Sequence, residues 1–131
     1  MYDHNKPNDE NGSLREGFRQ GFFKEGGLSW EGHFDAGHKT GNWRFYLKNG
    51  QLKAAGDYDN NHMTGYWEWY RINGRLMQTG SLDKDQKTGL WKRYHENGRL
   101  LDQGRFKNGR LTGLWKTFTD DGELLKSKIY L

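Results

Sequence analysis

The sequence TGLWKRYHENGRLLDQGRF, residues 88–106, is one copy of a pattern that recurs every 24 residues along the chain. Thr-Gly begins each copy at residues 40, 64, 88 and 112, and a tryptophan follows three residues after each threonine. An aromatic residue comes next, then an Asn-Gly or Asp-Gly pair, a leucine and, in the first three of these copies, a further glycine. The four tryptophans are Trp43, Trp67, Trp91 and Trp115. Self-similarity at a fixed period of this length predicts a repeat architecture.

Each copy has the sequence of a β-hairpin. Aromatic and β-branched residues favour strands, and Asn-Gly between two such runs is the strongest short signal for a hairpin turn, because both residues tolerate a positive φ. Trp43–Leu47 therefore forms one strand and Leu52–Tyr58 the return strand. Gly56 leaves room for a ring of the next copy to lie across the backbone. The polar stretches that link copies, such as Asp59–Thr64, are expected to be connectors, with the glycine that follows making the turn.

The expected fold class is all-β, with tandem β-hairpin repeats of 24 residues forming one elongated, twisted antiparallel sheet. Residues 16–39 are a degenerate copy in which Arg19 replaces the tryptophan, as an end repeat with one solvent-facing side would allow. Full copies follow at 40–63, 64–87, 88–111 and 112–131. Residues 1–15 are polar and form either an N-terminal arm or a partial hairpin.

Composition agrees with a thin aromatic core. The 131 residues have a mean hydropathy of −1.18, which alone favours disorder, but 15% of them are aromatic and these are regularly spaced. No cysteine, metal-ligand spacing or nucleophile–base motif occurs, so neither a catalytic site, a metal nor a cofactor is expected. The absence of an apolar span and of a signal-peptide pattern predicts a cytoplasmic location.

The net charge of +4 is spread among interspersed acidic and basic residues. It is compatible with an ordinary mixed-charge surface, an acidic protein partner or an anionic lipid surface. Nucleic-acid binding is not expected, because acidic residues interrupt the basic series.

The pattern G-x-W-x-x-Y-x-x-N-G-x-L-x-x-x-G-x-Y resembles the bacterial variant of the MORN repeat (membrane occupation and recognition nexus) over residues 16–131. Chains of that kind are often classed as antitoxins of the YwqK type. The resemblance implies hairpin repeats and a non-enzymatic role as an antitoxin or immunity protein that binds a toxin stoichiometrically. The wider family implies a membrane or lipid scaffold instead, while a similarity to aromatic choline- and glucan-binding repeats implies a glycan binder.

Function should lie where the copies differ. The third hairpin has aromatic residues beyond the shared pattern, in the segment Tyr66–Tyr70, and a charged residue stands beside each tryptophan. Aromatic and arginine side chains are typical of binding hot spots. The predicted partner-binding residues are Phe45, Tyr66, Glu68, Trp69, Lys92 and Arg93. The alternative is that Trp69 and Phe45 stack on each other across neighbouring copies. The open ends of the sheet would also allow a homodimer.

Overall fold

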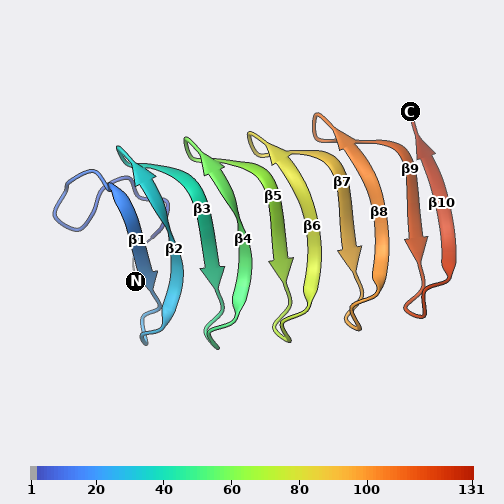
Figure 1. The fold of residues 1–131 in the computed structure, drawn as a ribbon, viewed down its shortest axis with the longest axis horizontal. Coiled ribbons are helices and arrows are strands. Elements are labelled where there is room, and N and C mark those ends of the chain that lie inside the picture. Colours follow the sequence, from blue (N-terminus) through green and yellow to red (C-terminus); the bar gives the residue numbers. More distant parts are fainter. Residues whose placement is uncertain (1–2) are drawn as a thin grey trace.

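The computed structural model describes residues 3–131, which form a single sheet of ten antiparallel strands in chain order (Figure 1). The strands lie side by side in one open row, with the two termini at opposite ends of the long axis. They are β1 Gly17–Phe22, β2 Leu28–Asp35, β3 His38–Tyr46, β4 Leu52–Asp59, β5 His62–Tyr70, β6 Leu76–Asp83, β7 Gln86–Tyr94, β8 Leu100–Lys107, β9 Arg110–Phe118 and β10 Leu124–Tyr130. The predicted all-β fold of tandem hairpins is confirmed. Residues 3–131 contain no helix that is long and apolar enough to cross a membrane.

The Asn-Gly turns differ in detail from the prediction. Gly50 has a φ of 89°, but Asn49 is not among the residues with positive φ. Leu47 N–H donates to the carbonyl of Gln51, and Gly50 N–H donates back to that of Leu47. The Asn49 side chain accepts a hydrogen bond of 2.9 Å from Gln51 N–H, which closes the loop from inside. Asparagine is therefore used here for its side-chain acceptor rather than for its tolerance of positive φ.

The connectors are shorter than predicted, and the expectation that the following glycine makes the turn is wrong. β4 continues to Asp59 and β5 already begins at His62, so only Asn60 and Asn61 turn the chain, with φ of 49° and 71°. Positive φ at both residues matches the twist of the paired strands. Gly65 lies inside β5, at a register shift opposite β4, with a φ of 70°. A glycine in this conformation is the usual first residue of a β-bulge.

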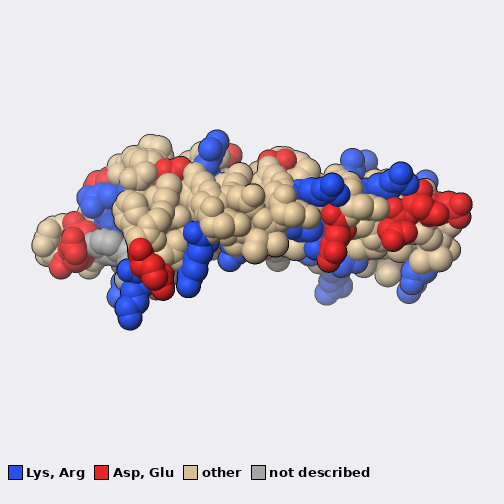
Figure 2. All heavy atoms as spheres, turned by 90° about the horizontal axis from the view of Figure 1, so that it is seen from below, with Lys and Arg blue, Asp and Glu red and all other residues tan. Residues whose placement is uncertain are grey.

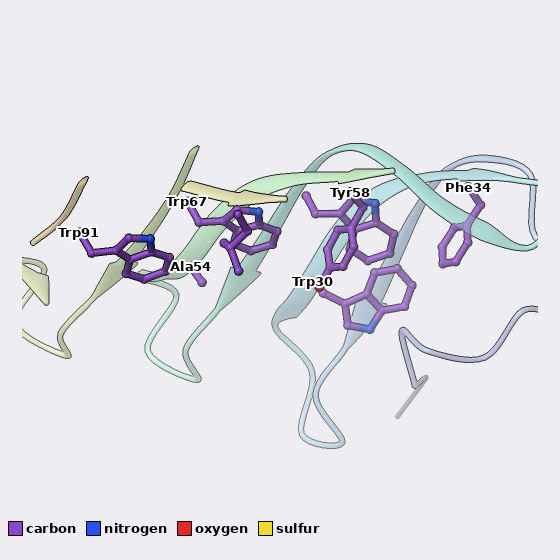
Figure 3. Packing of buried hydrophobic residues seen from close by; sticks show 8 residues of the cluster. Trp30, Phe34, Ala54, Tyr58, Trp67 and Trp91 are labelled. Atoms are coloured by element: carbon purple, nitrogen blue, oxygen red, sulfur yellow. The ribbon is translucent and has the colours of Figure 1, made fainter. Parts of the chain in front are cut away.

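This one-layer sheet makes its core from indole rings that pack on glycine backbones. An added Cβ on Gly56 would lie 2.0 Å from Cδ2 of Trp67, so this indole lies flat on the glycine backbone of the preceding strand. The same contact is made by Trp43 on Gly32, Trp91 on Gly80 and Trp115 on Gly104, as the sequence predicted for the glycine. Figure 3 shows the indoles of Trp30, Trp67 and Trp91 in a row along the sheet. The side of the sheet that carries Trp43, Trp67, Trp91 and Trp115 is called the tryptophan face below.

The N-terminal arm packs on the tryptophan face. The His4 ring lies 4.9 Å from that of Phe45, and the buried guanidinium of Arg15 lies over Trp30 and Phe34. Lys39 Nζ donates a 2.7 Å hydrogen bond to the Asn5 side chain. Asn8 and Leu14 form an isolated bridge within the arm. The first two residues of the predicted arm lie outside the described residues.

Candidate functional site

The six predicted site residues lie on opposite sides of the sheet. Strand alternation places Phe45, Trp69 and Arg93 on the tryptophan face. The remaining three, Tyr66, Glu68 and Lys92, lie on the other side, called the tyrosine face because it also carries Tyr46, Tyr70 and Tyr94. The structure therefore does not bring the six together into one surface. It makes two candidate surfaces, each with three of them.

On the tryptophan face, Phe45 and Trp69 extend the core. Ring centroids are 5.9 Å apart for Trp43–Phe45, 6.4 Å for Phe45–Trp67 and 5.9 Å for Trp67–Trp69, with interplanar angles below 30°. Each ring thus fills the gap between two tryptophans, and the expected direct stacking of Phe45 on Trp69 is replaced by this alternation. The series begins with Trp30 on Trp43 and ends with Trp69 against Trp91, at 5.5 Å. We call it the ring ladder.

Arg93 occupies the position in β7 that Phe45 and Trp69 occupy in β3 and β5. Its Nε donates a 3.0 Å hydrogen bond to Asp102 Oδ1, and its Nη2 donates to Asp102 Oδ2. Asp102 is buried, whereas about half of the Arg93 side chain (54%) is exposed. The two-point pairing raises the pKa of Arg93 and fixes the guanidinium plane. Arg93 is therefore a positioned cation at the C-terminal end of the ring ladder.

Two hollows flank Arg93. One, of about 170 Å³, is lined by Gln78, Lys87, Trp91, Arg93, Phe106 and Trp115. The other, of about 490 Å³, continues past Trp115 and Thr117 to the strand β10 side chains Lys126, Lys128 and Tyr130. Arg93 and Trp115 line both, so the hollows are neighbours on the tryptophan face.

The tyrosine face carries a line of exposed apolar side chains. Three of them stand at equivalent positions in β5, β7 and β9: Tyr66, Leu90 and Leu114, which are 56%, 38% and 49% exposed. The fourth, Ile129 in β10, pairs with Leu114 and is 67% exposed. Among residues 3–131, no second layer covers this side of the sheet. We call this line the apolar line.

Glu68 is held in place beside the apolar line. Its carboxylate accepts a 2.9 Å hydrogen bond from the Tyr70 hydroxyl and a longer one, 3.4 Å, from Tyr66. Burial and then the bond to Glu68 raise the pKa of Tyr70 to about 12, so that tyrosine stays protonated and continues to donate. Lys92 follows at the equivalent position of the next hairpin and is half-buried. The charged side chains of Glu68 and Lys92 beside the apolar line are therefore held in position by the protein itself.

Sequence reasoning missed the residues that line the two hollows, apart from Arg93. The sequence does contain a signal for these lining residues. It lies in the return strands, at the position that pairs with Phe45, Trp69, Arg93 and Thr117 of the tryptophan strands. The residues there change from apolar to polar and charged along the chain: Trp30, Ala54, Gln78, Asp102 and Lys126. The varying positions of the outgoing strands alone do not reveal this change.

Comparison with known proteins concerns the repeats. Residues 39–60 and 87–108 match the family model described as the MORN repeat variant. A solved structure entitled "Crystal structure of GtfA/B complex bound to UDP and GlcNAc" is similar over 85% of this chain and 26% of that chain, with 14% identity and a TM-score of 0.40. The present chain thus spans about a quarter of that chain. No curated protein matches. Each matched stretch contains all but the first residue of a tryptophan strand, its Asn-Gly loop and the complete return strand, so these two hairpins are similar to the MORN repeat variant.

Proposed function

We propose that this chain is a non-enzymatic protein-binding module that neutralises a toxin partner by stoichiometric binding, as an antitoxin or immunity protein does. The observation that carries the proposal is the apolar line on the tyrosine face. The regular scaffold repeats it on four strands of one sheet, from β5 to β10. Exposed apolar side chains gathered on one face among polar groups, here including Ser81 and Arg105 on the strands between them, are typical of protein-interaction sites.

The side chains of this face suit a protein partner. Tyr66 combines a large apolar ring with a hydroxyl, which is the kind of side chain that dominates binding energy at interfaces. The hydrogen bond from Tyr70 holds Glu68 without any contribution from a partner, so less conformational freedom is lost on binding.

Charge gives this face a preference among partners. The row beside the apolar line reads Arg44, Glu68, Lys92 and Lys116, three cations and one anion. Figure 2 shows that acidic and basic side chains are otherwise interspersed along the molecule. An acidic partner surface would meet the basic part of the row, and the net charge of +4 would speed the encounter at low salt.

The test starts with affinity capture from the source cells, using the tagged chain as bait and mass spectrometry as readout. One dominant protein at a one-to-one ratio is expected, and its toxic activity should fall when this chain is added. The double variant Tyr66→Ala/Leu90→Ala should weaken that complex about 10- to 100-fold. The matched control is Ile72→Ala, which removes an equally apolar side chain, 74% exposed, from the hairpin loop after β5. Equal affinity of both variants for the partner would reject the apolar line as its binding site.

A further inference from the structure

The ring ladder stops one ring short of the last tryptophan. Up to Trp91, each gap between consecutive tryptophans of the row holds an aromatic ring, from Phe45 or Trp69. Between Trp91 and Trp115 the equivalent position is Arg93, whose guanidinium is held by Asp102. The gap is the hollow of about 170 Å³ described above, with both indoles among its walls.

The size and walls of this hollow suit one aromatic ring. A cavity of roughly 150 Å³ lined by apolar side chains is enough to hold benzene. Trp91 is buried and Phe106 lies edge-on to it, at 6.1 Å between centroids, so two walls of the hollow are already arranged. Phe106 also meets Trp115 edge-on, at 6.3 Å. A ring entering here would continue the alternation that Phe45 and Trp69 make internally.

The mouth of the hollow is basic. Lys87 Nζ lies 4.7 Å and 5.0 Å from the ring centroids of Trp91 and Phe106. In the adjoining hollow of about 490 Å³ lie Lys126 and Lys128. Within residues 3–131, none of these three lysines forms an ion pair, and the single acidic side chain lining the hollows, Asp102, is paired with Arg93.

We propose that the two hollows together bind an acidic peptide segment of another protein, with one aromatic side chain between Trp91 and Trp115 and flanking carboxylates on Lys87, Lys126 and Lys128. The aromatic side chain replaces the missing ring. The carboxylates meet three ammonium groups that form no ion pair within residues 3–131, two of which, Lys87 and Lys128, lie over aromatic rings. This site lies on the tryptophan face, so it goes beyond the function proposed above and does not depend on it.

The probe is the blocked peptide Glu-Asp-Trp-Asp-Glu, with analogues that carry alanine in place of tryptophan or lysine in place of every acid. Titration calorimetry should give an affinity at least about ten-fold higher for the probe than for either analogue. In nitrogen-15 spectra of the full chain, the probe should shift the indole N–H signals of Trp91 and Trp115 and leave those of Trp30 and Trp43 in place. Equal affinity for the alanine analogue, or shifts of similar size at all tryptophans, would overturn the proposal.

Arg93→Phe/Asp102→Ala is the informative variant, because it replaces the Arg93–Asp102 pair by the Phe45–Ala54 pair of the first full hairpin. Its own ring should fill the hollow, and probe affinity should fall at least about ten-fold. Lys126→Glu/Lys128→Glu should do the same by reversing the charge on the exposed strand β10, even if the first variant folds poorly. Lys48→Glu, at an exposed loop position, is the charge control and should have little effect. Undiminished probe binding by the lysine variant would overturn the proposal.

Vesicles containing phosphatidylserine provide a further arm. Peptide binding that persists in their presence supports a protein segment as the occupant, whereas vesicle binding that depends on the same lysines and displaces the probe would assign the surface to lipid and overturn the proposal. The two proposals remain separable. Loss of peptide binding leaves the capture experiment of the tyrosine face unaffected, and a failed capture leaves the peptide titration intact.

Discussion

The N-terminal and C-terminal halves of the tryptophan face share one backbone design but differ in what fills it. In the first half, the rings of Phe45 and Trp69 lie between tryptophans, Trp30 stacks on Trp43 at the end of the row, and the N-terminal arm covers that end. In the second half, Arg93 and Thr117 stand at the ring positions, Trp115 is only half-buried and its face opens onto solvent. One row of side chains therefore decides whether the same hairpin contributes a filled core or an open hollow.

The largest expected difference concerns the tryptophans themselves. Trp67→Ala removes a fully buried indole between two stacked rings and should lower the free energy of unfolding by about 3–5 kcal/mol. Trp115→Ala removes a half-buried indole and should cost about 1–2 kcal/mol. Urea unfolding of the two variants and the parent checks this. Equal losses would mean that the two halves are equally packed in solution.

The glycines under the indoles sharpen the same comparison. An added Cβ would lie 2.0 Å from Cδ2 of Trp91 at Gly80 and 2.0 Å from Cε3 of Trp115 at Gly104. Trp91 is buried between Trp69 and Phe106 and has less freedom to move than Trp115, so Gly80→Ala should cost about 2–3 kcal/mol. Trp115 can tilt towards the open hollow, so Gly104→Ala should cost about 1 kcal/mol. Thermal unfolding followed by calorimetry should show a clearly larger drop in Tm for Gly80→Ala.

The Arg93–Asp102 pair should respond asymmetrically. Arg93→Ala leaves the buried Asp102 carboxylate without its partner and should cost about 1–3 kcal/mol, below the full value for a buried pair because Arg93 is half-exposed. Asp102→Ala leaves an arginine that water can reach and should cost less than about 1 kcal/mol. Denaturant curves of both single variants and the double variant give the coupling energy. A larger loss in Asp102→Ala than in Arg93→Ala would contradict this reasoning.

The repeat itself made much of the fold predictable. A 24-residue period fixes which residues are equivalent, so once one Asn-Gly loop and one tryptophan strand are recognised, all copies follow. The role of Gly56 beneath a ring of the next copy could also be inferred, because glycine is the residue that allows such a close approach. The two-residue turn at Asn60–Asn61 could not be inferred from the sequence. The residues on either side of it are polar and extend β4 and β5 by backbone pairing, which the hydrophobic pattern does not indicate.

The candidate site was less predictable than the fold, for a physical reason. Strand alternation already separates Trp69 from Tyr66, yet choosing residues by type alone joined the two faces into one site. The pairing of Arg93 with Asp102 spans nine residues and depends on cross-strand register, which the bulge at the end of β7 shifts. Whether an aromatic ring is core or exposed depends on the neighbouring copy, so Phe45 and Trp69 could not be assigned until the ring ladder was known.

The smallest expected effect concerns the N-terminal arm, which covers the first half of the tryptophan face. His4 lies among the rings of Trp30, Trp43 and Phe45. Burial is the main cause that lowers the pKa of His4 to about 4, and the charge of Lys39 is the next. Asp3 has a smaller effect that raises this pKa, and Arg15 and Lys53 lower it further. A released arm would have the ordinary pKa of 6.5. Between pH 6.5 and 4 the released arm binds a proton that the docked arm does not, so docking is fully favourable above pH 6.5 and weakens as the pH falls towards 4.

Amide hydrogen exchange measures this docking locally, because Arg15 N–H donates to the Pro7 carbonyl and Gly37 N–H to that of Arg15. Protection factors, which correct for the intrinsic pH dependence of exchange, should fall at both amides on going from pH 7 to pH 4.5. The variant His4→Gln should lose most of this pH dependence, while amides of β5 and β6 stay protected in both proteins because the rest of the ring ladder does not require the arm. Parallel pH profiles for the parent and the variant would show that the arm is held by Arg15 and Asn5 alone. The burial of the N-terminal half of the tryptophan face would then come from the stacked rings and not from the N-terminal arm.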